Sequence, residues 1–383
     1  MRRISAGAAL VVSVLTLIVG SGLSGAAADA AQAPWPMALH DNRHSGTSAV
    51  DGPTSGRVLW TRNLQGNITP GPAVGPGGSI YVATNSGVLS ALDPTTGANE
   101  WTFNGGTALG GETDLSTTPL VLPSGDILWP GSGNTLFELS PTGAMLWSHR
   151  FSTQPLSPTL SGTRAYVEQM DGTLSAFDIA PETPQLAWSL SLGATSYGSP
   201  VIAPNGAIIT TAGRHVIDVV DAGSKARIVW SYTTAAPIEV SASVGADGTV
   251  VVSTNDRYVY ALESDGSLKW KSERGTESYS SSSVSGSLAY YGDNSGTLHV
   301  VREKSGTPVA TDRGTKGIWA AQAVDGKGDV YFGTQGKQIY GFGPHGAKLF
   351  DITASGPIDS YPALTAKGDL IIGDEAGTLY AIG

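Results

Sequence analysis

A four-strand pattern recurs along this chain about every forty residues, and this periodicity constrains the fold more than any other feature. Each repeat alternates apolar and polar residues with period two and is interrupted by Gly, Asn and Asp turns, as in GVLSALDPTTGANEW over 87–101. One position of the pattern is occupied in turn by Pro72, Pro119, Pro158, Pro200, Ala242, Ser282, Gln322 and Pro362. Four short strands per repeat predict one blade of a β-propeller.

The ends of the chain predict how the ring closes. The last repeat supplies three strands and stops at Gly383, whereas the segment RVLWTRNL over 57–64 precedes the first complete repeat. We expect 57–64 to pair with 378–382, because an open ring would leave two unpaired sheet edges. The predicted fold is therefore an all-β, eight-bladed propeller of four-stranded antiparallel blades over 57–383, closed by an N-terminal outer strand that completes the C-terminal blade.

Six of the nine tryptophans occupy one register of the predicted outer strands. A large flat ring at that register can bridge neighbouring blades while its indole N–H finds a carbonyl oxygen. We therefore predict a structural docking role between blades for Trp60, Trp101, Trp147, Trp188, Trp230 and Trp270.

Two segments resemble a known family. ALDPTTGANEW over 91–101 is similar to the A-x-D-x-x-T-G-x-x-x-W docking motif of PQQ-like β-propeller repeats, which occur in quinoprotein alcohol dehydrogenases and in BamB-type assembly proteins. WPMALHDNRHSGTS over 35–48 resembles the arm that opens secreted bacterial members of this family. The resemblance implies the fold and leaves the activity open, because one scaffold can serve enzymes, sensors and binding modules.

The segment before the repeats divides into two parts. Residues 1–30 combine an arginine pair, a short apolar run and small residues with A-x-A triplets, which predicts a cleaved secretory signal peptide; an uncleaved anchor helix is the alternative. Residues 31–56 form an N-terminal arm containing His40, Asp41 and His44. We expect this arm to cap the propeller and to bind no metal, since no further ligands are near in sequence.

Charge and cysteine content exclude several functions. Removing 1–30 takes away two arginines and one aspartate, which changes the formal net charge from −10 to −11. Such an acidic surface repels nucleic acid. The chain has no cysteine, which excludes disulfides, thiolate metal sites and a cysteine nucleophile. We expect a secreted or extracellular monomer, with the cell envelope as a further possibility and without stable membrane insertion.

An enzymatic role is the less favoured interpretation. The quinoprotein dehydrogenases that the repeats resemble hold their cofactor with adjacent cysteines and a calcium ion, under long insertions; here cysteine is absent and the repeats average about 41 residues. We considered PQQ with calcium and expect no cofactor. The hairpin DGKGD over 325–329 predicts a turn rather than a calcium loop. No catalytic residue is assigned, although a carboxylate pair for polysaccharide cleavage stays open.

A candidate binding surface lies at one mouth of the predicted channel. Three residues before the recurring position lie Thr69, Ser116, Pro155, Tyr197, Glu239, Tyr279, Trp319 and Asp359. Apolar residues precede several of them, at Ile68, Leu115, Ile238, Ile318 and Ile358, so alternation predicts that the apolar members face inward and the others face the mouth. We propose ligand binding for Tyr197, Glu239, Tyr279, Trp319 and Asp359; ordinary loop residues are the alternative.

These patterns favour a secreted, non-catalytic binding or scaffold propeller. Its channel-mouth surface would be presented to a protein, peptide or carbohydrate ligand, because aromatic faces with interspersed carboxylates suit a sugar or a cationic peptide. The alternative is an extracellular enzyme, either polysaccharide-degrading or a PQQ-dependent oxidoreductase.

Overall fold

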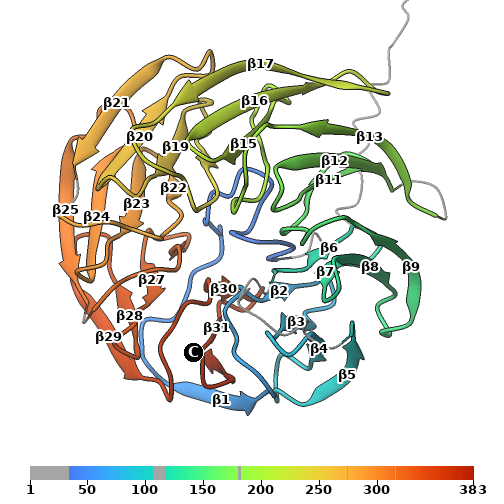
Figure 1. The fold of residues 1–383 in the computed structure, drawn as a ribbon. Helices are drawn as coiled ribbons and strands as arrows, with labels where there is room; N and C mark the ends of the chain where they lie inside the picture. Colours follow the sequence, from blue (N-terminus) through green and yellow to red (C-terminus); the bar gives the residue numbers. More distant parts are fainter. Residues whose placement is uncertain (1–33, 107–116, 180–182, 274, 315) are drawn as a thin grey trace, which may run out of the picture. The chain divides into compact units, whose positions relative to one another are not determined.

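Eight four-stranded antiparallel sheets make up the described part of the chain. The computed structural model describes residues 34–106, 117–179, 183–273, 275–314 and 316–383, and these residues contain strands and no helix. The sheets are arranged around one axis as the blades of an eight-bladed propeller, which confirms the fold expected from the repeats (Figure 1). The predicted signal peptide lies outside the described residues.

Each blade runs from a short innermost strand to a longer outer strand. The innermost strands are β2 (Ala73–Val74), β6 (Leu120–Val121), β10 (Thr159–Ser161), β14 (Val201–Ile202), β18 (Ser243–Val244), β22 (Ser283–Ser285), β26 (Ala323–Val324) and β30 (Ala363–Leu364). The second strands are β3 (Ile80–Ala83), β7 (Ile127–Gly131), β11 (Arg164–Glu168), β15 (Ile208–Ala212), β19 (Val250–Ser253), β23 (Leu288–Gly292), β27 (Val330–Gly333) and β31 (Leu370–Gly373).

The two remaining strands of each blade are the longer ones. The third strands are β4 (Val88–Leu92), β8 (Thr135–Leu139), β12 (Thr173–Asp178), β16 (His215–Asp221), β20 (Tyr258–Leu262), β24 (Thr297–Arg302), β28 (Gln338–Phe342) and β32 (Thr378–Ile382). The outer strands are β5 (Asn99–Asn104), β9 (Met145–Arg150), β13 (Gln185–Ser191), β17 (Ala226–Thr233), β21 (Leu268–Glu273), β25 (Pro308–Arg313), β29 (Lys348–Thr353) and β1 (Val58–Asn63).

The ring closes by pairing the first strand with the last. β1 runs antiparallel to β32, in a register that places Val58 opposite Ile382 and Asn63 opposite Thr378. The eighth blade therefore has the order β1-β32-β31-β30, and the other seven follow the sequence (Figure 1). This is the predicted closure, and it leaves neither end of the blade series as an open edge.

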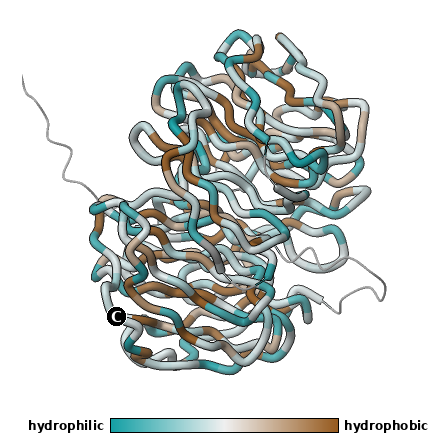
Figure 2. The backbone as a smooth tube through the Cα atoms, turned by 90° about the vertical axis from the view of Figure 1, so that its left-hand side faces the viewer, coloured by the Kyte–Doolittle hydropathy of each residue, from teal (hydrophilic) through white to brown (hydrophobic). Residues whose placement is uncertain are grey.

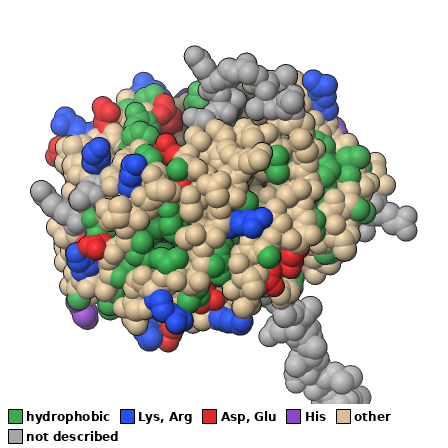
Figure 3. Space-filling view, turned by 90° about the horizontal axis from the view of Figure 1, so that it is seen from below, with side chains coloured by type: hydrophobic (Ala, Val, Ile, Leu, Met, Phe, Trp, Pro, Cys, Tyr) green, Lys and Arg blue, Asp and Glu red, His purple; other side chains and the backbone are tan. Residues whose placement is uncertain are grey.

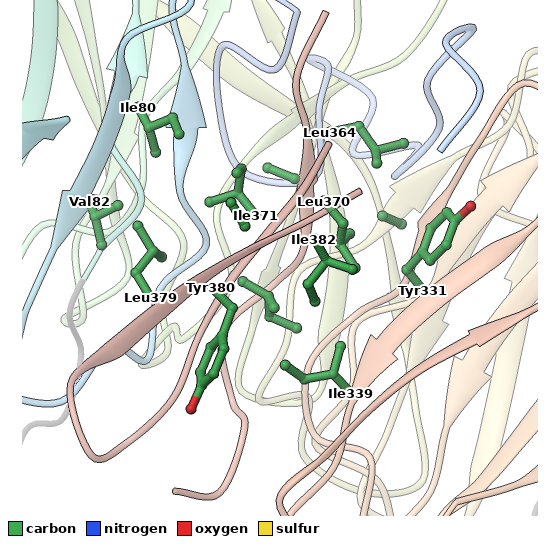
Figure 4. Close-up of a cluster of buried hydrophobic side chains, with 14 of the residues drawn as sticks. Ile80, Val82, Tyr331, Ile339, Leu364, Leu370, Ile371, Leu379, Tyr380 and Ile382 are labelled. Atoms are coloured by element: carbon green, nitrogen blue, oxygen red, sulfur yellow. The ribbon is translucent and has the colours of Figure 1, made fainter. Parts of the chain in front are cut away.

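The hydrophobic core lies between blades. One buried cluster joins Ile80 and Val82 of the first complete blade to Leu370, Ile371 and Leu379 of the closing blade (Figure 4). Inner strands such as β2, β3 and β31 are buried along their whole length, and hydrophobic stretches alternate with paler and hydrophilic ones along the backbone (Figure 2). Outer strands such as β1, β5 and β9 alternate between exposed and half-buried residues. On the rim, hydrophobic side chains therefore appear among polar ones rather than as a continuous face (Figure 3).

The outer-strand tryptophans contact the following blade. The indole N–H of Trp101 donates a hydrogen bond of 2.8 Å to the carbonyl oxygen of Pro141, and that of Trp270 donates one of 2.6 Å to Glu303. Trp60 and Trp230 donate in the same way to the carbonyl oxygens of Pro94 and Ser264, whereas Trp188 donates to the side-chain Oδ1 of Asp221. Trp147 instead packs edge-on against Phe177, with ring centroids 5.7 Å apart.

A turn glycine of the next blade makes room for several of these rings. At Gly97 the backbone has φ 67°, and an added Cβ would lie 2.5 Å from a ring carbon of Trp60. Gly143 meets Trp101 in the same way. Glycine is therefore needed there both for the left-handed backbone and for the approach of the ring. The T-G-x-x-x-W part of the repeat thus describes a contact between blades, since the glycine of one blade lies under the tryptophan of the preceding one.

We predict that Trp101→Ala destabilises the protein by about 2–4 kcal/mol, because it removes a large, half-buried ring and one hydrogen bond. Urea unfolding followed by circular dichroism measures the change. Trp319→Ala is the matched control: Trp319 is 37% exposed, so its loss should cost less than about 1 kcal/mol. Equal losses at the two positions would contradict a role of the outer-strand ring in joining blades.

Candidate functional site

The N-terminal arm crosses the centre of the ring and binds the free edges of the innermost strands (Figure 1). Its carbonyl oxygens accept hydrogen bonds of 2.6–2.9 Å from backbone N–H groups at the C-terminal ends of six innermost strands. These donors are Val74, Val121, Ile202, Val244, Val284 and Val324. The arm thus supplies partners to edge groups that would otherwise face the channel unpaired, and it closes the channel at this end, which we call the arm mouth.

Asp41 organises the turn at the middle of the arm. Its Oδ1 accepts backbone N–H bonds of 3.0 Å from Arg43 and from Ser45, and its Oδ2 accepts the hydroxyl of Ser45 at 2.8 Å. His40 packs edge-on against Trp35, with ring centroids 4.9 Å apart. The described residues contain no group of three or more His, Asp or Glu side chains placed to hold a metal ion. The absence of a metal in the arm stays a prediction.

A cavity of about 160 Å³ lies on the propeller axis beside the arm. Leu39 and His44 line it from the arm, and Thr69 and Tyr197 line it from the loops before the innermost strands. Most of the remaining wall carries hydroxyl groups, from Thr117, Thr118, Ser157, Ser199, Ser241 and Tyr361. The cavity is therefore lined by hydroxyl groups and apolar side chains, with no carboxylate, lysine or arginine.

The imidazole of His44 is enclosed without a protein partner. Both ring nitrogens are buried and make no hydrogen bond within the described structure. Burial lowers the pKa of His44 to about 4. The ring is thus neutral at physiological pH and offers one donor and one acceptor at the base of the channel.

Hydroxyl groups around the channel join neighbouring blades. The backbone N–H of Ser199 donates to the Oγ of Ser241 at 2.8 Å, and that of Thr118 donates to the Oγ of Ser157 at 3.0 Å. The Oγ of Ser360 donates to the carbonyl of Pro70 at 2.9 Å, across the closing blade. These contacts give the small polar residues near the recurring position a structural role.

The opposite end of the channel carries exposed aromatic side chains, and we call it the aromatic mouth. Tyr197, Tyr279 and Trp319 are 43%, 38% and 37% exposed, respectively. Tyr279 and Trp319 touch edge to face, with ring centroids 5.7 Å apart. These residues precede the innermost strands whose far ends bind the arm, so arm and aromatics lie at opposite mouths. Their predicted inward neighbours Ile68, Ile238, Ile318 and Ile358 are buried, whereas Leu115 lies outside the described residues.

The other predicted mouth residues differ in their surroundings. Glu239 is exposed, and Asp359 is half-buried and accepts a hydrogen bond from the Nε2 of Gln335. Pro155 is buried, so it contributes little to the mouth surface, and Ser116 lies outside the described residues. The structure thus brings Tyr279 and Trp319 into contact and places Tyr197 at the axial cavity. Ligand binding by Tyr197, Glu239, Tyr279, Trp319 and Asp359 stays a prediction.

Glu168 is a buried titratable group that the sequence patterns did not single out. It ends β11, is fully buried, and accepts a hydrogen bond from the hydroxyl of Thr210 in the neighbouring blade. Burial raises the pKa of Glu168 to about 8. A perturbed carboxyl group of this kind is a common mark of a catalytic acid, but the side chain of Glu168 has no access to a ligand in this structure. The sequence signal that could have identified Glu168 is the acidic residue in YVEQ, at a place where the second strands are otherwise mostly apolar.

The channel does not fit a quinone cofactor such as PQQ, whose carboxylates need basic partners. The residues lining the axial cavity include no lysine or arginine, and its volume of about 160 Å³ falls below the roughly 300 Å³ usual for cofactor-sized ligands. The hairpin at 325–329 forms a turn: the Oδ1 of Asp325 accepts N–H bonds from Lys327 and Asp329, and its Oδ2 accepts one from Gly52. The absence of a cofactor stays a prediction.

Fold and channel together define a closed, eight-bladed propeller whose axial channel is plugged by its own N-terminal arm. A family model described as outer membrane protein assembly factor BamB matches residues 44–113, 106–213 and 179–383. These matches cover most of the sequence, so the chain belongs to the BamB family of PQQ-like propellers. Among the described residues, no helix has the length and apolar character to span a membrane.

Individual relatives are distant in sequence. The outer membrane protein assembly factor BamB of Yersinia pestis is 22% identical over 225 residues, which cover 55% of this chain and 54% of that protein. This chain therefore matches about half the length of that relative. Protein Rv3035 of Mycobacterium tuberculosis is 25% identical over 347 residues, covering 88% of this chain and 74% of that protein.

The crystal structure of quinohemoprotein alcohol dehydrogenase from Comamonas testosteroni is similar in fold. It superposes with a TM-score of 0.77 at 12% sequence identity, covering 93% of this chain and 81% of that one. At this level of identity the similarity extends to the fold alone.

We predict that Glu168→Gln stabilises the protein more at pH 8 than at pH 5. The pKa of Glu168 is raised to about 8 in the folded chain, against about 4.3 when unfolded. Between these values folding takes up a proton, so the contribution of Glu168 to stability is present below about pH 4.5 and is lost as the pH rises towards 8. Glutamine keeps the shape without taking up a proton.

Urea unfolding of both proteins at pH 5 and pH 8 measures this difference, which should be about 3–4 kcal/mol. Glu239→Gln, at an exposed position, is the control and should show no such difference. A gain at Glu168→Gln that is the same at both pH values would show that the carboxyl group is ionised in the folded protein.

Proposed function

We propose that this chain is a cell-envelope scaffold whose aromatic mouth binds an extended, cationic segment of a partner protein. Family membership supports the scaffold part, because the matching family and the Yersinia relative are named for outer membrane protein assembly. The observation that carries the proposal is the contrast between the two mouths. One is filled by the arm, and the other presents Tyr197, Tyr279 and Trp319 with more than a third of each side chain exposed.

The chemistry of the aromatic mouth favours a cationic peptide. Flat aromatic surfaces supply contact area at a low cost in side-chain entropy, and they attract cations to their faces. Glu277 is exposed on the loop that carries Tyr279, Glu239 is exposed on the corresponding loop before β18, and Asp359 is half-buried on the loop before β30. The formal net charge of −10 adds a long-range attraction for basic segments.

An enzymatic alternative finds less support. The similarity to quinohemoprotein alcohol dehydrogenase is limited to the fold, at 12% identity. The axial cavity has no basic side chain for a quinone, and the buried carboxyl of Glu168 is shielded from any substrate. We therefore propose a non-catalytic role without a cofactor. The predicted signal peptide supports export from the cytoplasm, and family membership supports a location in the cell envelope.

The test is a triple variant, Tyr197→Ala with Tyr279→Ala and Trp319→Ala. An array of extended synthetic peptides of graded charge identifies a binder, and fluorescence anisotropy measures its affinity. We expect lysine- and arginine-containing peptides to bind, the affinity to fall at least tenfold in the triple variant, and the binding to weaken with salt, since screening reduces attraction between exposed charges.

The matched control changes three exposed apolar residues of the outer strands, Met145→Ala, Leu146→Ala and Leu186→Ala, which are 56%, 54% and 49% exposed. This control should bind the peptide as well as the unchanged protein. An equal loss in both variants would contradict the assignment of the mouth. Binding to a glycan array with no binding to any peptide would replace the protein partner with a carbohydrate.

A further inference from the structure

A groove of about 630 Å³ lies between the blade formed by β14–β17 and the β20–β21 turn of the next blade, and Asn205, Gly206 and Ala207 of the turn after β14 line one end of it. Trp230 and Val229 of β17 line it together with Asp218 and Val220 of β16, and the turn residue Asp265 of the next blade completes the wall. Three carboxylates, from Asp218, Asp221 and Asp265, line the groove, and no lysine or arginine does.

Asp218 departs from the repeat at this position. It lies opposite Trp230 in the strand ladder. In four other blades the partner of the equivalent tryptophan is alanine, at Ala91, Ala176, Ala261 and Ala381. A carboxylate is therefore not required by the strand pair or by the tryptophan. Only the pair of Glu138 and Trp147 also has an acid there.

One carboxylate oxygen of Asp218 has no hydrogen-bond partner in the described structure. Asp218 is 5% exposed, and its Oδ1 is buried without a hydrogen bond in the described structure. Leaving a charged oxygen buried and unpaired is costly. Burial raises the pKa of Asp218, and the nearby indole N–H of Trp230 and the guanidinium of Arg227 only partly oppose this rise.

The other two acids of the groove already have partners. Asp221 accepts hydrogen bonds from Arg164 at 2.7 Å and from Tyr166 at 2.9 Å. Asp265 accepts the backbone N–H and the hydroxyl of Ser267, at 2.9 Å and 2.6 Å. Asp218 is thus the carboxylate in this groove that gains most from an added cation.

We propose that this groove binds a lysine side chain of a protein partner, with the ammonium group at Asp218. An ammonium ion there donates a charge-assisted hydrogen bond to the carboxylate and lies near the indole of Trp230. The aliphatic stem of lysine matches the apolar walls given by Val220 and Val229. Ile228 and Val229 are 41% and 45% exposed beside the groove, so they extend the contact surface to the backbone of a partner. This site is separate from the aromatic mouth.

The experiment uses the indole N–H signals of the nine tryptophans in a two-dimensional NMR spectrum of the whole protein. Trp230→Phe assigns one signal, and N-acetyl-lysine-methylamide is the probe. We expect the Trp230 signal to shift in a saturable way, and the uncharged analogue N-acetyl-norleucine-methylamide to leave it unchanged. Asp218→Ala and Asp218→Asn should each weaken binding at least tenfold.

Glu138→Ala is the matched control and should bind the probe unchanged, because Glu138 holds the equivalent position in another blade. Asp218→Ala introduces the residue found in four other blades, so the remaining indole signals should keep their positions. Binding should also weaken as the pH falls, since a proton then competes for the carboxylate. The proposal is overturned if the Trp230 signal does not shift, if norleucine shifts it equally, if Asp218→Ala retains the affinity, or if free cadaverine binds while the blocked lysine does not.

Discussion

The pairing of β1 with β32 is the contact on which the rest of the structure depends. A propeller blade buries its faces only against two neighbours, so a series of blades has two unsatisfied ends until it closes. Here one strand from the beginning of the propeller completes the blade formed by its end, and the cluster around Ile80, Leu370 and Leu379 buries the resulting seam. Closure thereby fixes the number of blades and the width of the axial channel.

Because the channel has this width, the backbone N–H groups of the innermost strands face it without a neighbouring strand, and the arm supplies their hydrogen-bond acceptors. The innermost strands have two or three residues each, and their inner edges face the axis without a further strand. The arm carbonyls accept hydrogen bonds from the N–H groups of six of them, and buried arm side chains such as Trp35 and Met37 add hydrophobic contacts. The ring nitrogens of His44 are buried without a hydrogen-bond partner where the arm fills the channel, which is unfavourable for stability.

The period and register of the repeats made the fold predictable from the sequence, whereas the buried acids Glu168 and Asp218 became apparent only in the structure. The alternation of strands, the incomplete last repeat and the tryptophan of 57–64 were enough to predict eight blades and the terminal pairing. They were also enough to place Ile238 and Ile318 inside and Tyr279 and Trp319 outside. Glu168 and Asp218 escaped prediction because their burial depends on a neighbouring blade, which is about forty residues away in sequence.

Repetition also separates structural residues from candidates for function. A residue that recurs at one register, such as the alanine opposite four of the six outer-strand tryptophans, is explained by the packing that the blades share. A residue that differs from its equivalents in most other blades and buries a carboxylate, such as Asp218, is not explained by that packing. The same argument applies to the mouth, where, among the described loops before the innermost strands, exposed aromatics lie on those of Tyr197, Tyr279 and Trp319. In a propeller, therefore, the departures from the repeat are the positions at which individual blades can acquire a function of their own.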